Sequence, residues 1–137
     1  MQGLDKVIAS LEAGQQKQML SDETFVRQQR ILDELAPRLW SELRRTFQSE
    51  CKSYPKYLTF EVQPETCAYI RCSKGNRLET KYLPQSKTIE FRIGDTRGQY
   101  FIGLDEKNRA AIHDMDGTVY PQNHLVETLL KFVLESA

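Results

Sequence analysis

The chain has 137 residues, and its 19 basic and 19 acidic side chains give a formal net charge of zero at pH 7. This length fits one domain that buries roughly two thirds of the surface of its unfolded form, so the chain needs no disulfide or metal to fold. The even charge balance excludes the strongly basic field that carries nonspecific binding to nucleic acid or acidic membranes. We therefore expect no nucleic-acid partner.

Cysteine spacing and hydropathy indicate the cellular environment. Cys51, Cys67 and Cys72 match neither a disulfide framework nor paired CxxC zinc motifs, so reduced thiols are expected. The first 18 residues lack the long apolar core of a signal peptide, and no stretch approaches the ~20 apolar residues that cross a bilayer. These features predict a cytoplasmic protein without a membrane segment.

Residues 1–54 carry helical periodicity. Leu4, Val7, Ile8 and Leu11 have the i, i+3, i+4, i+7 spacing that lines one face of a helix. A polar stretch follows, and Ser21 with two acidic residues after it indicates the start of a second helix. The sequence thus predicts a short amphipathic helix followed by a longer one.

The second predicted helix carries a broad apolar stripe from Phe25 to Phe47, with Pro37 inside it. Because proline cannot donate to the carbonyl four residues back, we expect a kink, or a fresh helix start with Pro37 in the first turn. The helical part should end at Tyr54, since the residue before Pro55 is driven toward extended backbone.

After Pro55 the apolar period changes from 3.6 to 2, which is typical of half-buried strands. Strands are predicted around 58–62, 68–72, 78–82, 89–93 and 100–104, with a sixth around 110–112. The intervening turns are short, including one over 94–98, so consecutive strands should form an antiparallel meander. An apolar segment from Leu125 to Leu134, with Asn123 as a candidate cap, predicts a closing helix.

Together these patterns predict an α+β fold with N-terminal helices, a five- to six-stranded antiparallel meander sheet, and a C-terminal helix packed on one sheet face. We interpret residues 1–137 as a single domain. Its parts are a helical segment at 1–54, the antiparallel sheet at 55–120 and the C-terminal helix at 121–137.

One segment suggests chemistry. Asp114-Met115-Asp116-Gly117-Thr118 resembles the first motif of the haloacid-dehalogenase-like phosphatases. The resemblance implies Asp114 as nucleophile, Asp116 as general acid/base, and a magnesium ion. In that family the motif ends a parallel strand, whereas here it follows a strand of the predicted antiparallel meander. We therefore interpret it as a tight turn in which Gly117 supplies a positive φ.

Other motifs for chemistry are weak. Cys67 and Cys72 lie an odd number of residues apart on one predicted strand, so they project from opposite faces and cannot chelate one ion unless a bulge intervenes. The chain has two histidines, no GxSxG elbow and no glycine-rich phosphate loop at a helix start. The sequence accordingly predicts no catalytic, metal-binding or cofactor-binding residues, and it favours a protein that is not an enzyme.

The solvent-exposed face of the predicted sheet carries a candidate binding surface. Its members combine positive charge with aromatic stacking area: Tyr69, Arg71, Lys81, Arg92 and Phe101. Glu61, Glu79 and Glu90 are expected on the same face. Opposite charges on neighbouring strands also give ordinary lateral support to a solvated sheet, so both interpretations stay open.

The helical segment offers a second surface. Phe25, Val26 and Ile31, with Trp40 beside the main stripe, provide more apolar area than one sheet face needs. Surplus apolar residues on a helix often pack on a partner, so one expectation is self-association as a homodimer. The other expectation is burial within the chain.

These observations favour an interaction or scaffold module, without enzymatic activity, that binds a protein partner or a second copy of itself. The working surface would be the helical segment or the exposed sheet face. The alternative is a small-ligand-binding or enzymatic α+β fold. Its pocket would lie between sheet and helices and be lined by aromatic side chains such as Tyr82, Phe91 and Tyr100.

Overall fold

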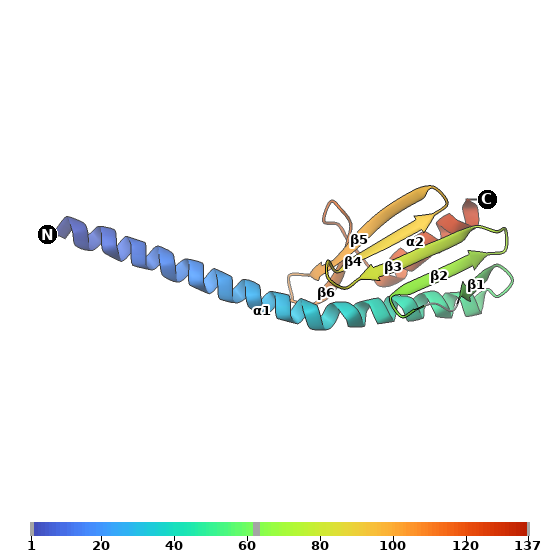
Figure 1. The fold of residues 1–137 in the computed structure, drawn as a ribbon, viewed down its shortest axis with the longest axis horizontal. Helices are drawn as coiled ribbons and strands as arrows, with labels where there is room; N and C mark the ends of the chain where they lie inside the picture. Colours follow the sequence, from blue (N-terminus) through green and yellow to red (C-terminus); the bar gives the residue numbers. More distant parts are fainter. Residues whose placement is uncertain (1, 62–63, 137) are drawn as a thin grey trace.

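The computed structural model describes residues 2–61 and 64–136. A long helix, an antiparallel sheet and a shorter helix follow one another along the chain (Figure 1). Their bounds are α1 Gln2–Ser53, β1 Leu58–Glu61, β2 Cys67–Cys72, β3 Arg77–Leu83, β4 Thr88–Ile93, β5 Thr96–Leu104, β6 Ala110–His113, β7 Val119–Tyr120 and α2 Gln122–Glu135. The predicted α+β class, with its antiparallel meander and closing helix, is confirmed.

α1 is one helix of 52 residues, so the predicted division into a short and a longer helix is wrong. The polar stretch that suggested a break contains Gly14 but no proline, and its glutamines and lysine are good helix formers. A glycine inside a helix costs only about 1 kcal/mol relative to alanine, which does not end a helix favoured on both sides. Ser21 accordingly lies within the helix and not at its start.

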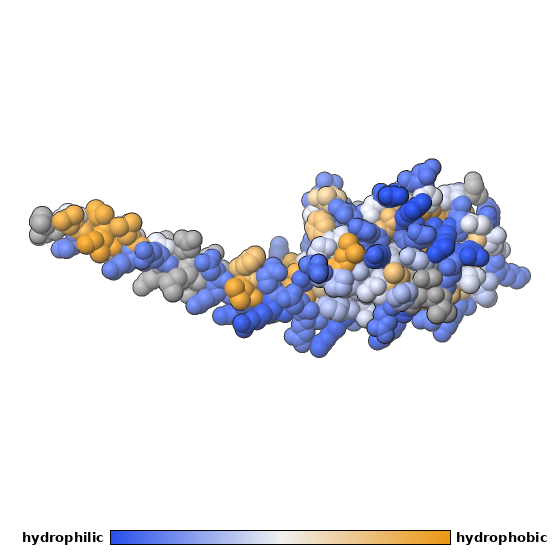
Figure 2. Space-filling view, viewed as in Figure 1, coloured by the Kyte–Doolittle hydropathy of each residue, from blue (hydrophilic) through white to orange (hydrophobic). Residues whose placement is uncertain are grey.

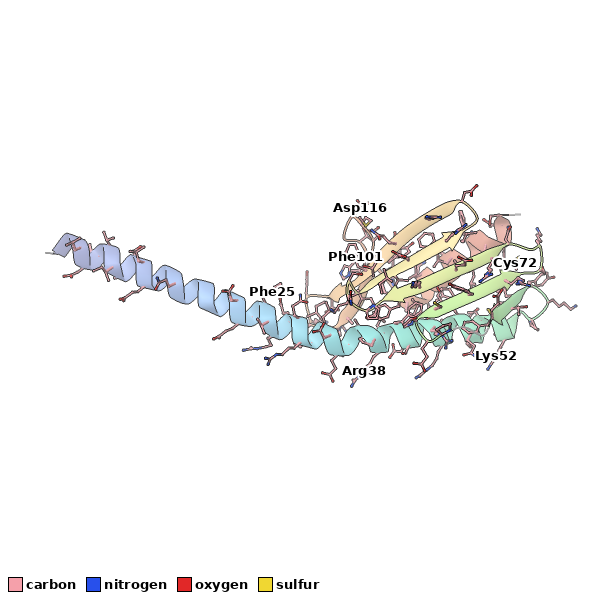
Figure 3. All side chains as sticks on the ribbon, viewed as in Figure 1. Phe25, Arg38, Lys52, Cys72, Phe101 and Asp116 are labelled. Atoms are coloured by element: carbon pink, nitrogen blue, oxygen red, sulfur yellow. The ribbon has the colours of Figure 1, made fainter. Side chains whose placement is uncertain are left out.

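Pro37 also lies inside α1. It has no N–H to donate to the carbonyl of Asp33, and the helix axis changes direction close to Arg38 (Figure 3). Near this bend the helix meets the sheet, and the Asp33 carboxylate lies 2.6 Å from the ammonium of Lys87 in the β3–β4 turn. Toward its N-terminus, α1 extends beyond the sheet (Figure 1).

The sheet has seven strands in sequence order, and every neighbouring pair is antiparallel. It holds the six predicted strands and one more, because the two residues of β7 are too few to show an alternating pattern. The predicted turn over 94–98 is shorter than expected. β5 begins at Thr96, which places Arg97 and Gly98 in the strand, opposite Arg92 and Phe91.

Gly98 has a packing role in this strand. The ring of Phe91 lies 2.4 Å from the position that a Cβ atom on Gly98 would occupy. Only glycine leaves room for the ring to lie against the strand backbone, which explains a glycine at a position that is not a turn.

The core lies between one face of the sheet and the two helices. The buried side chains that α1 contributes are Ala36, Trp40, Leu43, Phe47 and Cys51, and those of α2 are Leu125, Val126, Leu129, Leu130 and Val133. They pack on alternate residues of the strands, among them Ile70, Leu78, Ile89, Ile102 and Ile112. The opposite face of the sheet, the outer sheet face, is left free of helices.

α2 begins at Gln122 after Pro121, and no side chain caps it, so the prediction of Asn123 as the cap is wrong. Gln122 has another role: its amide donates to the Thr46 hydroxyl at 2.7 Å and ties the start of α2 to α1.

Candidate interaction surfaces

The N-terminal half of α1 extends away from the rest of the molecule. We call residues 2–30 the arm, and the remainder of the chain the base. Six large apolar side chains of the arm are about half exposed or more: Leu4 53%, Val7 55%, Ile8 52%, Leu11 63%, Phe25 62% and Val26 49%. We call these six the arm face. Figure 2 shows apolar colour gathered at the free end of the arm and again nearer the base.

The arm face lies on the same side of α1 as the residues that pack on the sheet. An α-helix returns to the same direction after about 18 residues, or five turns. Val7, Phe25 and the buried Leu43 follow one another at this interval, and Leu11 lies twice the interval from the buried Phe47. The same side of α1 therefore forms the core in the base and is exposed at the six residues of the arm face.

The residues predicted as surplus apolar area divide between the two parts. Phe25 and Val26 are exposed on the arm, whereas Ile31 is partly buried where α1 meets the base. Trp40 is only 3% exposed. Its indole N–H donates to the carbonyl of Glu65 at 2.7 Å and its ring stacks on Tyr82, so Trp40 is not available to a partner.

Sequence reasoning missed the other part of the arm face. The local spacing of Leu4, Val7, Ile8 and Leu11 predicts only a short amphipathic helix. Val7 and Ile8 lie 18 residues before Phe25 and Val26 in the sequence, and this interval identifies one helix face once the intervening stretch is known to be helical.

The five residues of the predicted sheet surface all lie on the outer sheet face. Tyr69 aligns across the strands with Glu79, Arg92 and Arg97, and Lys81 aligns with Glu90 and Gln99 in the next row. Arg71, beside Arg77, and Phe101, beside His113, lie in the rows on either side. The predicted residues are thus spread over four rows of the sheet and do not form one compact cluster.

Ion pairs account for one corner of this face. The two carboxylate oxygens of Glu61 lie 3.1 Å from Arg71 and 3.7 Å from Arg77, and Glu79 lies 3.6 Å from Arg77. The Arg77 guanidinium also lies over the Tyr69 ring, 4.7 Å from its centroid. Burial raises the pKa of the Tyr69 hydroxyl. Arg71 and Tyr69 therefore belong to a network of contacts that links neighbouring strands. This agrees with the interpretation that opposite charges on this face support the sheet laterally.

A groove across β2 to β5 is different. It has a volume of about 510 Å³, and its lining residues include Tyr69, the three cations Lys81, Arg92 and Arg97, and the two carboxylates Glu79 and Glu90. Arg92 and Arg97 lie directly opposite each other. Among the described residues, none of these three cations is within 4 Å of a carboxylate. Like charges opposite each other weaken a sheet slightly, so lateral support does not explain the Arg92–Arg97 pair. Lys81 lies opposite Glu90, and Arg92 also lies opposite Glu79 on its other side.

Phe101 lies outside this groove. Its ring is stacked with that of His113 at a centroid distance of 6.5 Å, and His113 Nδ1 lies 3.1 Å from the carbonyl of Ala111. These contacts give Phe101 a packing partner within its own sheet, separate from the cations.

The aromatic residues of the alternative pocket each pack on another aromatic ring. Tyr82 stacks on Trp40, Phe91 on Tyr100, and Tyr100 meets Tyr120 edge to face at 5.5 Å. On the helix side, a groove of about 600 Å³ lies between the end of α1 and α2, and other residues line it. A small-ligand pocket between sheet and helices stays a prediction.

The Asp114 segment forms the turn that the sequence indicated. One oxygen of the Asp114 carboxylate accepts the N–H groups of Asp116 and Thr118 at 2.9 Å, and the other accepts the Tyr120 hydroxyl at 3.2 Å. Gly117 has a φ of +84°, as predicted. The Asp114 hydrogen bond raises the pKa of Tyr120. The carboxylate is thus engaged in holding its own loop.

The described residues contain no group of three His, Cys, Asp or Glu side chains placed to hold a metal ion. The three cysteines are unpaired and buried. Burial, followed by the charge of Glu50, raises the pKa of the Cys51 thiol to about 11.

Comparison of the chain with protein-family models, with curated proteins and with solved structures finds no match. No helix within the described ranges has both the length and the apolar character needed to cross a bilayer.

Proposed function

We propose that this protein is an interaction module in which the base is a rigid support and the arm is the element that binds another protein. The partner would cover the arm face with apolar surface of its own. In the base, the sheet covers the same side of α1 in this way.

The exposed arm face supports this proposal. Single exposed apolar residues are normal on a protein surface, but six on one side of one helix, in one cluster over residues 4–11 and another at residues 25–26, expose apolar area of the kind found at interaction sites. The helix itself adds a second reason. Most helical stability in proteins comes from packing of an apolar face, and the six apolar side chains of the arm face are exposed. A partner would stabilise the arm as well as cover it.

Site-specific photo-crosslinking tests the proposal. A photoreactive phenylalanine analogue is placed at Leu11 or Phe25, and as a matched control at Ala13, which lies about 200° round the helix from Leu11. Illumination of cells that express the full chain should give protein adducts from positions 11 and 25 and few from 13. Equal yields at all three positions, or none at any, would refute an interaction through the arm face.

A second candidate surface is the groove of the outer sheet face, which would bind an acidic segment of a partner. It is favoured by the juxtaposition of Arg92 and Arg97 with Lys81 nearby, since an acidic ligand would relieve the repulsion between the opposed arginines. Three of the five predicted residues, Tyr69, Lys81 and Arg92, line this groove.

A fluorescent polyglutamate peptide is a suitable probe for this groove. Binding measured by anisotropy should weaken with salt and should be lost in the Arg92→Ala, Arg97→Ala double variant. The control is Arg38→Ala, which removes an exposed arginine of α1. Loss of binding in the control to the same extent, or no binding by the unaltered chain at low salt, would remove the groove from consideration.

A further inference from the structure

We infer that the partner of the arm is a second copy of this chain, bound antiparallel along the arm face. This inference rests on the proposed function of the arm and names its partner.

The two apolar clusters of the arm face match each other in an antiparallel pair. Val7 and Phe25 lie on one flank of the face, and Ile8 and Val26 lie on the other, each pair 18 residues apart. When two helices meet through a two-fold axis perpendicular to them, each flank contacts the same flank of the partner. Val7 then meets Phe25 of the second copy while Ile8 meets its Val26, and the axis passes near residue 16.

The length of the arm fits this pairing. With the axis near residue 16, residue 2 of one copy lies beside residues 30–31 of the other, an overlap of about 43 Å at 1.5 Å per residue. Among the residues of α1 whose burial the structure describes, Gln29 is the first that is partly buried, and Ala36 is the first that is fully buried. The second helix therefore covers the bare part of the face and stops where the base takes over.

A parallel pair is excluded by the position of the base. Beyond residue 31 the sheet lies on the same side of α1 as the arm face. Two parallel arms in contact would bring both sheets into the space between two helices only about 10 Å apart. In the antiparallel pair the two bases lie at opposite ends and do not compete for space.

The buried area is of the size that a modest dimer requires. Each apolar side chain removes about 60–120 Å² from water when fully buried, so the twelve side chains of two arm faces contribute roughly 700–1,400 Å². Stable interfaces bury about 1,200–2,000 Å² in total. Polar residues beside the face add to the sum, so we expect a dimer that exchanges with the monomer at micromolar concentrations.

Asp22 gives a test by gain of binding. It points in the same direction as Leu4, 18 residues before it, and in the pair it lies at the height of the partner's Leu11. A carboxylate opposite a leucine weakens the contact. Asp22→Leu should therefore tighten the dimer about tenfold in sedimentation experiments, because the new side chain is buried against Leu11.

Disulfide trapping tests the direction of the pair. A tagged chain with Val7→Cys is mixed with an untagged chain with Phe25→Cys under mild oxidation. The expected product is a disulfide-linked mixed pair, with little homodimer from either variant alone. Leu11→Cys should not link to itself, because its two copies are about 16 Å apart along the axis. The unaltered chain, whose three cysteines are buried, is the control.

The outcomes separate this inference from the proposed function. Efficient Leu11→Cys homodimers would show a parallel pair and overturn the inference while leaving an interacting arm. Two results together would also overturn the second copy as partner. The chain would remain at the monomer mass of 15.9 kDa with and without Asp22→Leu, and the photo-adducts at position 11 would contain a different protein. With no adducts at all, both the inference and the proposed function fail.

Discussion

Leu11 and Phe47 allow a direct test of the division into arm and base. They are 36 residues apart, so they point the same way, yet Leu11 is 63% exposed and Phe47 is fully buried. Removing a buried phenylalanine side chain costs about 3–5 kcal/mol, the transfer free energy plus the cavity that remains. A surface residue without contacts changes stability by less than about 0.5 kcal/mol. Phe47→Ala should therefore lower the free energy of unfolding by about 3–5 kcal/mol, and Leu11→Ala should leave it unchanged.

The assay is urea unfolding followed by the fluorescence of Trp40, the single tryptophan, which is buried in the base. Samples are kept dilute, because self-association would add stability through mass action. If too little Phe47→Ala folds, Phe47→Leu gives the same comparison at smaller cost. A loss of more than about 2 kcal/mol in Leu11→Ala would show that the arm face packs on the base, and would refute the division.

Three further predictions concern single groups in the base. Cys51, with its pKa raised to about 11 by burial, should react with Ellman's reagent at pH 8 only as fast as the chain unfolds; rapid reaction in the folded state would contradict its burial. Asp114→Ala should lower the pKa of Tyr120 toward its ordinary value, visible as one tyrosine that ionises earlier in an absorbance titration; an unchanged titration would contradict the Asp114–Tyr120 contact. The backbone N–H of Arg109 holds the pKa of Asp105 low, so the stability that this carboxylate adds is present above its unfolded pKa and is lost as pH falls through its folded pKa. Asp105→Asn should accordingly flatten the acid side of the stability profile, and an unaltered profile would count against it.

The sheet could be predicted because its signals are local. Alternation places Ile70 and Leu78 on one face and Arg71 and Arg77 on the other, and short turns leave only antiparallel pairing. The same local reasoning predicts the turn at Asp114, since that turn needs only neighbouring N–H groups and a glycine.

The long helix and the groove depend on relations that local patterns do not contain. Gly14 and the glutamines after it suggest a break in the helix because no apolar residue continues the apolar face at these positions. A helix can nevertheless continue through such a stretch when it contains no proline and its residues tolerate helical backbone. The local pattern predicts Trp40 as surplus apolar area because its contacts, Tyr82 and the carbonyl of Glu65, are distant in the sequence. Predicting the groove would require placing Arg97 in β5, opposite Arg92. That placement depends on where the turn at Gly94 ends and β5 begins.

Sedimentation velocity over a range of concentrations tests the central claim, that the arm face is a binding surface for a second copy. The unaltered chain should move from the mass of one 15.9 kDa chain toward twice that mass as its concentration rises through the micromolar range. The Leu11→Glu, Phe25→Glu variant should stay monomeric, and Ala13→Glu should associate like the unaltered chain. Equal association by all three chains would contradict the account, and so would a purely monomeric unaltered chain.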